Sequence, residues 1–260
     1  MIRLKSFPVV ALLLLILGLV GLQLHHLSLS TAPSQKPRRY HREQIPVHPA
    51  VAPRNDADVS KSLEGVDDLR AYYRDPQNLP GGIGPGAERY RKAMESLRKN
   101  SPAALYYLEE ILLHGGENRQ VRLEILKIIS EHRGEATRVL LAGLFADPRE
   151  DEMIRSAALY EVSRYPGDES FRVMKEVYEL EPAFPGRYQI VKAAGETGSP
   201  EAIPFLQGRL SLIEPLDVRC HAASALGRFI DSPRVFELLK GLALGDRYED
   251  VRINALNQMG

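Results

Sequence analysis

An arginine that recurs every 32 or 33 residues is the feature that most constrains the fold of this chain. It lies in five segments that align without gaps, at successive spacings of 33, 32, 32 and 33 residues. The five residues are Arg122, Arg155, Arg187, Arg219 and Arg252. A fixed period of this length is typical of repeat proteins, in which each repeat is one supersecondary unit that stacks on its neighbours.

The residues that follow each arginine predict a helix, which we call helix B. Counted from the arginine, the third, fourth and seventh positions are apolar in all five segments, and this spacing places them on one helix face. The third positions are Ile125, Ala158, Ile190, Ala222 and Ala255. The eighth position is always Ser or Gly, as expected where a helix ends and a neighbouring backbone comes close.

A second apolar segment precedes each helix B and predicts a partner, which we call helix A. Several of these segments open with Ser-Pro, which places an N-cap before a proline at the first helical position. Each repeat is therefore helix A, turn, helix B, turn. Five such pairs predict an all-α, right-handed solenoid over residues 86–260, with a separate capping helix at 87–99.

Two segments, DVRCHAASALG at 217–227 and DVRINALNQMG at 250–260, resemble the short HEAT-like repeats of the phycobilin-lyase (PBS lyase) type. Repeats of that type commonly open helix B with Asp-Val-Arg and close it with Ala-Leu-Gly. The resemblance covers roughly residues 100–260. It is looser at Pro185-Gly186 and at Gln120, which stand where the pattern has Asp-Val.

The resemblance implies that the arginines form a structural ladder between adjacent repeats. Each one falls in the first turn of a helix, where the helix dipole disfavours a cation. We therefore expect carboxylates to offset the charge, with Asp217 and Asp250 in place to do so, along with Glu152 or Asp151. A row of ligand-binding arginines is the alternative.

The amino terminus predicts a membrane segment within residues 1–25. Residues 8–24 carry no charge and follow Arg3 and Lys5. As a helix they would span roughly 26 Å, the short end of what crosses a bilayer. We expect a single-pass signal anchor with the body outside the cytoplasm, in the periplasm if the source is bacterial. The alternative is a cleaved signal peptide and a secreted or periplasmic protein.

Residues 26–85 are rich in Pro, Ser and charged side chains and predict a flexible linker. A short helix is expected within it at 66–74. The Gly-rich segment that follows, up to Gly86, has no strand before it and contains Pro85, so we interpret it as a hinge rather than a phosphate-binding loop.

Helix B positions one, two and five after the arginine are not used for the core. In HEAT-like stacks the B helices line the concave surface, so these side chains are the candidates for protein binding. The predicted binding residues are Lys127, Tyr160, Tyr188, Lys192, His221 and Asn254. Tyr160, Tyr188, Lys192 and His221 form the predicted centre, because tyrosine and histidine among small polar groups suit adaptable recognition. An ordinary solvated face is the alternative.

Charge and composition argue against two other classes of function. Residues 101–260 carry 19 Lys and Arg against 25 Asp and Glu, whereas a nucleic-acid surface needs an excess of basic residues. No His-Glu dipeptide of the kind that binds metal in a HEAT-like hydroxylase is present. Cys220 and His221 diverge by about 100° on a helix, which disfavours a catalytic dyad.

The sequence thus predicts a membrane-tethered scaffold or adaptor that binds a protein partner, without a cofactor, a metal or nucleic acid. The alternative is a lyase-like subunit that acts on a protein-bound or small-molecule substrate. The apolar face of the last helix B is not followed by a polar capping helix, so either self-association or docking of a partner is expected at the C-terminal repeat.

Overall fold

The computed structural model describes residues 56–114, 116–181 and 184–260. Every regular element of this part is a helix, apart from an isolated bridge between Leu79 and Ile83. The predicted membrane segment at 1–25, and residues 26–55 of the predicted linker, lie outside the described residues. The described residues belong to one unit of the chain.

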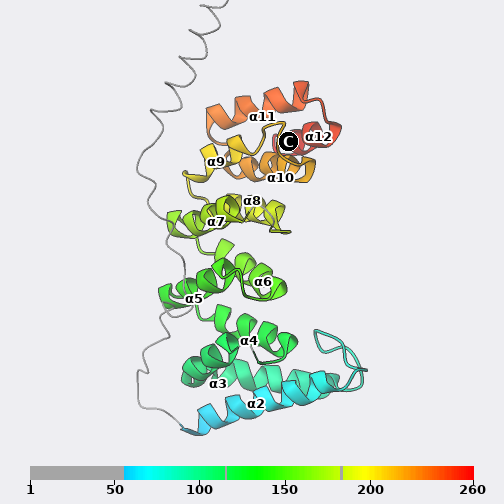
Figure 1. The fold of residues 1–260 in the computed structure, drawn as a ribbon, viewed down its shortest axis with the longest axis vertical. Coiled ribbons are helices and arrows are strands. Elements are labelled where there is room, and N and C mark those ends of the chain that lie inside the picture. The colour runs from blue at the N-terminus through cyan, green and yellow to red at the C-terminus, as the bar shows by residue number, and fades with distance from the viewer. Residues whose placement is uncertain (1–55, 115, 182–183) are drawn as a thin grey trace, which may run out of the picture. The chain divides into compact units, whose positions relative to one another are not determined.

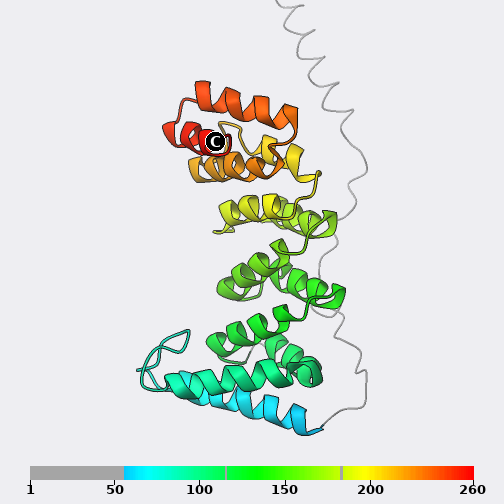
Figure 2. The same cartoon turned by 180° about the vertical axis from the view of Figure 1, so that it is seen from behind.

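The helices stack in chain order, with α5 and α7 along one side and α4, α6 and α8 along the other (Figures 1 and 2). The chain opens with the hairpin formed by α2 (Asp56–Arg74) and α3 (Ala87–Leu113). The B helices are α4 (Arg119–Glu131), α6 (Glu152–Ser163), α8 (Arg187–Glu196), α10 (Leu216–Leu226) and α12 (Glu249–Asn257). The A helices are the second half of α3, then α5 (Glu135–Ala146), α7 (Asp168–Leu180), α9 (Ala202–Gly208) and α11 (Pro233–Gly245). This is the architecture of an α-solenoid; its right hand stays a prediction.

The apolar positions of helix B form the core, as the period predicts. All five residues at the third position have no exposed surface. The fourth position is buried in the first four repeats, whereas Leu256 on α12 is 59 % exposed because no described element packs over it. Each large side chain buried in this way stabilises the stack by about 1.5–3 kcal/mol.

The small residue at the eighth position permits close helix packing at Gly195. A Cβ atom added there would lie 2.8 Å from the Cβ atom of Ala225 and 3.0 Å from its Cα atom. The backbone of α8 at Gly195 therefore packs directly against Ala225 of α10. At Gly227 an added Cβ would instead meet the side chain of Gln258.

The predicted linker is wrong for residues 56–74, which form the 19-residue helix α2 rather than a flexible segment with a short helix at 66–74. Val66, Leu69 and Tyr72 are buried against α3. The apolar residues of α2 are few, and Ser62 and Gly65 share its buried face. The helix is therefore stabilised by its packing on α3 rather than by a strong apolar pattern of its own.

The Gly-rich segment between α2 and α3 is a closed loop rather than the predicted hinge. Leu79 and Ile83 exchange backbone hydrogen bonds across it. The hydroxyl of Tyr72 lies within hydrogen-bond distance of the carbonyl oxygens of both, at 2.7 and 2.8 Å, and shares its one proton between them. Gly81 and Gly82 turn the chain at φ of 80° and 78°, a conformation that other residues rarely adopt.

Helix α3 is continuous through Pro102, so the capping helix predicted at 87–99 and the first helix A are one helix. Proline lacks the N–H group that would bond the carbonyl of Arg98 one turn earlier. The hydroxyl of Ser101 donates to that carbonyl instead, at 3.2 Å. The side-chain amide of Asn100 also donates to the carbonyl of Ser96, at 2.7 Å, and the helix continues.

Arg219 shows how an arginine of the row connects two repeats. Its Nε donates to the carbonyl oxygen of Leu210, just after helix A of the same repeat, at 3.1 Å. Its terminal nitrogen donates to Asp246, in the turn between helices A and B of the next repeat, at 2.5 Å. The arginine is 1 % exposed, so its charge is offset by a helix-end carbonyl and a carboxylate together.

The same two contacts recur at the earlier arginines. Each donates to a carbonyl near the end of its own helix A: Arg122 to Leu112 at 2.8 Å, Arg155 to Phe145 at 2.9 Å and Arg187 to Tyr178 at 3.2 Å. Each also approaches a carboxylate of the next repeat: Arg122 to Glu150 at 2.6 Å, Arg155 to Glu181 at 2.8 Å and Arg187 to Glu214 at 3.8 Å. Arg252 on the last helix B donates to the carbonyl of Asp246 at 2.9 Å.

The carboxylates of this ladder are not the predicted Asp217 and Asp250. Both lie in the first turn of a helix B, where a negative charge is favourable, but Asp217 accepts from the backbone N–H of Val218 at 2.8 Å. The guanidinium groups point toward the turns between helices A and B. Their carboxylates therefore come from the following repeat, 26 to 28 residues further along the chain.

Candidate functional site

A groove of about 590 Å³ lies over three successive B helices, α6, α8 and α10. We call it the B-helix groove. Its lining comprises Ser156, Leu159, Tyr160, Ser163, Arg164, Tyr188, Gln189, Lys192, Ala193, Glu196 and His221. All four residues predicted as the centre of the binding surface, Tyr160, Tyr188, Lys192 and His221, are among them.

Two aromatic rings from adjacent repeats form one wall of the groove. Tyr188 on α8 and His221 on α10 stack with their centroids 5.0 Å apart and their planes inclined by 22°. Tyr160 on α6 is 63 % exposed. These rings come from equivalent faces of neighbouring helices, so the repeat itself brings them together.

Burial lowers the pKa of His221 below its usual value, and the nearby positive charge of Lys192 lowers it further, while Asp217 opposes both. The imidazole is therefore neutral at pH 7. A neutral ring can stack on Tyr188 and still offer one donor and one acceptor nitrogen.

Cys220, beside His221 in the sequence, is half-buried and is not part of the groove lining. Burial raises the pKa of its thiol, and the negative charge of Asp250 raises it further. The thiolate is the nucleophilic form of cysteine, so this environment does not activate the residue.

Lys127 and Asn254, the other two predicted binding residues, do not line the groove. Lys127 forms an ion pair with Glu124 on its own helix at 3.0 Å. The side-chain amide of Asn254 donates to the carbonyl of Asp250 at 2.7 Å and its oxygen accepts from Ser224 at 2.7 Å. Their side chains are therefore engaged within or between the helices.

Glu124 joins the N-terminal hairpin to the first repeat. It lies two positions after Arg122, where the sequence predicts an open surface, but its carboxylate is buried. Glu124 on α4 is 2 % exposed. It accepts a hydrogen bond from the hydroxyl of Tyr73 on α2 at 3.0 Å, in addition to its ion pair with Lys127. The helix α2 thus covers this part of the B-helix face, which is why the position is not available for binding.

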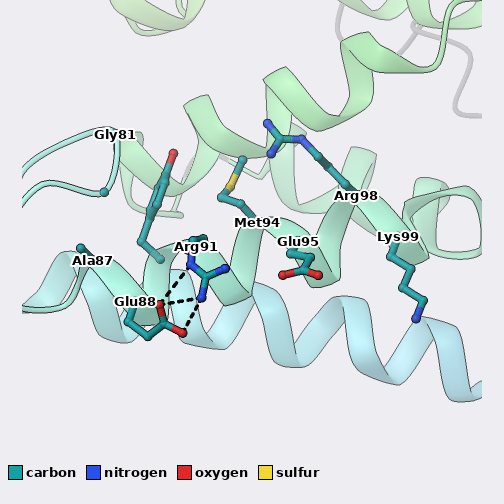
Figure 3. A pocket seen from close by; sticks show the side chains of 10 residues that line it. Gly81, Ala87, Glu88, Arg91, Met94, Glu95, Arg98 and Lys99 are labelled. Atoms are coloured by element: carbon teal, nitrogen blue, oxygen red, sulfur yellow. Dashed lines mark hydrogen bonds and ion pairs between the residues drawn. The ribbon is translucent and has the colours of Figure 1, made fainter.

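A second hollow, of about 870 Å³, lies between the Gly-rich loop and the first half of α3. Figure 3 shows Arg91 and Glu88 turned toward one another, with Arg98 and Lys99 pointing in opposite directions. Arg91 pairs with Glu88 at 2.7 Å, and Arg98 pairs with Glu131 of α4 at 3.0 Å. Both guanidinium groups already have carboxylate partners.

The C-terminal repeat exposes apolar side chains. Leu244 on α11 is 78 % exposed, and Leu256 and Ile253 on α12 are 59 % and 46 % exposed. These are the residues through which the predicted self-association would act. That association stays a prediction.

No group of three or more His, Cys, Asp or Glu among the described residues is placed to hold a metal ion. None of the helices described between residues 56 and 260 is long and apolar enough to cross a membrane.

Comparison with known families finds HEAT repeats in the C-terminal part of the chain, over residues 180–260. This range covers helix B of the third repeat and the whole of the fourth and fifth. No curated protein and no solved structure gives a significant match. The first and second repeats carry the same arginine contacts as the matched part.

Proposed function

From HEAT repeats over residues 180–260 and the continuous stack of helix pairs, we propose that this chain is a scaffold that binds a partner protein through the B-helix groove. HEAT repeats commonly mediate protein–protein interaction. The finer likeness to the PBS lyase type, drawn from the segments at 217–227 and 250–260, stays a prediction.

The placement of Tyr160, Tyr188, Lys192 and His221 in one groove is the observation that carries this proposal. Lys192 is exposed, like Tyr160, and both Tyr188 and His221 are only partly buried. The core positions of α6, α8 and α10 are filled by other residues. Aromatic side chains held by a rigid scaffold provide contact area at low entropic cost, which favours a binding role.

We further propose that the body is tethered to a membrane outside the cytoplasm, through the apolar segment at residues 8–24. The basis is the sequence alone: a 17-residue uncharged run preceded by Arg3 and Lys5. Protease treatment of cells stripped of any outer membrane or wall, before and after permeabilisation of the inner membrane, tests the orientation, since a body outside the cytoplasm is digested in both. Release of a soluble, shortened chain would indicate cleavage of the segment instead.

Crosslinking in the native membrane followed by affinity purification and mass spectrometry tests the scaffold function. A partner captured by the native chain is then assayed with all four groove residues changed to Ala. We expect capture to be lost. Lys127→Ala with Asn254→Ala is the matched control, because both residues lie on B helices outside the groove.

Unchanged capture by the four-residue variant would contradict the groove as the binding surface. Turnover of a small molecule by the purified chain would favour the lyase-like alternative. No contact among the described residues favours that alternative at present.

A further inference from the structure

Lys192 carries a positive charge in the B-helix groove, and no carboxylate among the described residues pairs with it. Glu196, one turn further along α8, is paired with Arg228 at 2.5 Å. Arg164, at the end of α6, is paired with Glu161 at 3.3 Å. Lys192 itself has no hydrogen bond or ion pair with any residue that the structure describes. The groove therefore presents one positive charge, although residues 101–260 as a whole are acidic.

The surroundings of Lys192 suit a carboxylate and its apolar neighbour. Tyr188 and His221 provide a flat stacked wall, and Leu159 and Ala193 contribute apolar lining. The hydroxyl of Tyr188 accepts from the side-chain amide of Gln189 at 3.3 Å, which leaves its own proton free to donate. An ammonium and a phenol hydroxyl beside an aromatic wall can bind a carboxylate and the side chain next to it.

A phosphate group fits this groove less well than a carboxylate. A phosphorylated side chain carries about −1.5 to −2 charges at pH 7, and its binding sites typically use clustered arginines. Here the guanidinium of Arg164 is already paired, and His221 is neutral. One ammonium matches the single charge of an Asp or Glu side chain.

We propose that the B-helix groove binds an extended segment of the partner protein through an internal Asp or Glu that pairs with Lys192, with an apolar or aromatic neighbour against Tyr188 and His221. This inference rests on the proposed function, since it names the chemistry of the partner at the same groove. The ion pair with Lys192 would determine which partner binds, and the rings of Tyr188 and His221 would provide most of the contact area.

A displayed random-peptide library, with each peptide flanked on both sides so that it has no free C-terminal carboxylate, tests the inference on the full-length chain. We expect the selected peptides to share an Asp or Glu next to an apolar or aromatic residue. Replacing that acidic residue with Asn or Gln in the best synthetic peptide should weaken binding about tenfold, the loss expected for one charge-assisted hydrogen bond. A peptide with the carboxylate only at its free C-terminus should bind no better than the Asn or Gln form.

Variants of the chain assign the effect to Lys192. Lys192→Gln should abolish the preference for the acidic peptide, whereas Lys192→Arg should retain it. Lys127→Gln is the control, an exposed lysine on a B helix outside the groove. Circular dichroism should show the same unfolding curve for the native chain and both Lys192 variants, because Lys192 is exposed.

Selected peptides without an acidic residue, or an acidic peptide whose preference survives Lys192→Gln, would overturn the inference. If such peptides still lost binding on Tyr160→Ala, the groove would remain a binding surface and the proposed function would stand. Some peptides could bind the Tyr160→Ala chain, and the chain with all four groove residues changed to Ala, as tightly as they bind the native chain. That result would contradict the proposed function itself.

Discussion

The guanidinium of Arg219 and the carboxylate of Asp246 meet across two repeats, at 2.5 Å, with both side chains less than one-tenth exposed. Replacing Arg219 with Ala leaves Asp246 buried without its partner and the carbonyl of Leu210 without its donor. We expect a loss of about 3–5 kcal/mol in unfolding free energy, measured by urea denaturation. Arg252→Ala, at the equivalent and partly exposed place in the last repeat, should cost about 1 kcal/mol. Equal losses would contradict a ladder between repeats.

Gly195→Ala should destabilise the chain by about 1–3 kcal/mol, the usual cost of overpacking. The added methyl group would lie 2.8 Å from Ala225 on the adjacent helix B. Gly241→Ala is the matched control, since Gly241 lies inside α11 and nothing lies within 4 Å of its added methyl group. Higher helix propensity should make that variant up to about 1 kcal/mol more stable. Thermal unfolding of both variants shows whether each change lowers or raises the stability of the chain.

Glu124→Ala should release helix α2 from the first repeat. The change removes the acceptor of the Tyr73 hydroxyl and the partner of Lys127. Amide hydrogen exchange should quicken over residues 56–74 while α8 and α10 keep their protection. Glu95→Ala, an exposed carboxylate on α3, is the control. Unchanged exchange in α2 would show that apolar packing on α3 suffices to hold it.

Two tyrosines at the same junction make stability fall at high pH. Burial raises the pKa of Tyr90 to about 12, with Glu124 adding to the effect, and burial raises the pKa of Tyr73 as well. A pKa raised in the folded state contributes stability that is complete below the unfolded value of about 10 and is lost as pH rises through the folded value. Unfolding free energies at pH 9 and pH 11 should therefore differ less in a chain carrying Tyr73→Phe and Tyr90→Phe.

His221 should make stability fall on the acidic side. Its pKa is lowered in the folded state by burial and by Lys192. Its contribution is therefore complete above the unfolded value of about 6.5 and is lost as pH falls through the lower folded value. Urea denaturation at pH 7.5 and 5.0, compared between the native chain and His221→Phe, isolates this residue from the other histidines. The variant should show the smaller pH dependence, and an equal dependence would contradict the assignment.

The exposed apolar side chains of the last repeat predict self-association at high protein concentration. Leu244→Lys with Leu256→Lys should shift the apparent mass toward the monomer in light scattering, because both residues are more than half exposed. Leu180→Lys, an exposed leucine at the end of α7, is the control. A native chain that stays monomeric at high concentration would contradict the prediction.

The repeat was predictable because its period fixes which residues of helix B face the core. The positions of Ile125, Ala158 and Ile190 follow from counting, and so does the placement of Tyr160 and Lys192 on the open face. The carboxylates of the ladder were not predictable in this way. Glu150 and Glu181 follow their arginines by 28 and 26 residues, because the turns that carry them differ in length.

The N-terminal hairpin was missed because its stability lies in contacts distant in sequence. Helix α2 buries Ser62 and Gly65 on the same face as Val66 and Leu69, so its apolar pattern is weak when read alone. The burial of Glu124 depends on Tyr73, 51 residues earlier. A rule based on positions within helix B alone cannot predict a contact with a residue of α2.

The contact between Arg187 and Glu214 is the longest of the four ion pairs in the ladder, at 3.8 Å, because Glu214 also pairs with Arg209 at 2.9 Å. Electrostatic attraction weakens with distance, so the attraction between the two charges is weakest in this ion pair of the four. The ion pair lies at the joint between the third and fourth repeats. That joint lies between α8 and α10, where the stacked rings of Tyr188 and His221 face each other across it. Helix α8 also packs directly on Ala225 of α10 through Gly195, so the spacing of the two rings that a bound segment would meet is set by close helix packing and does not depend on this one ion pair.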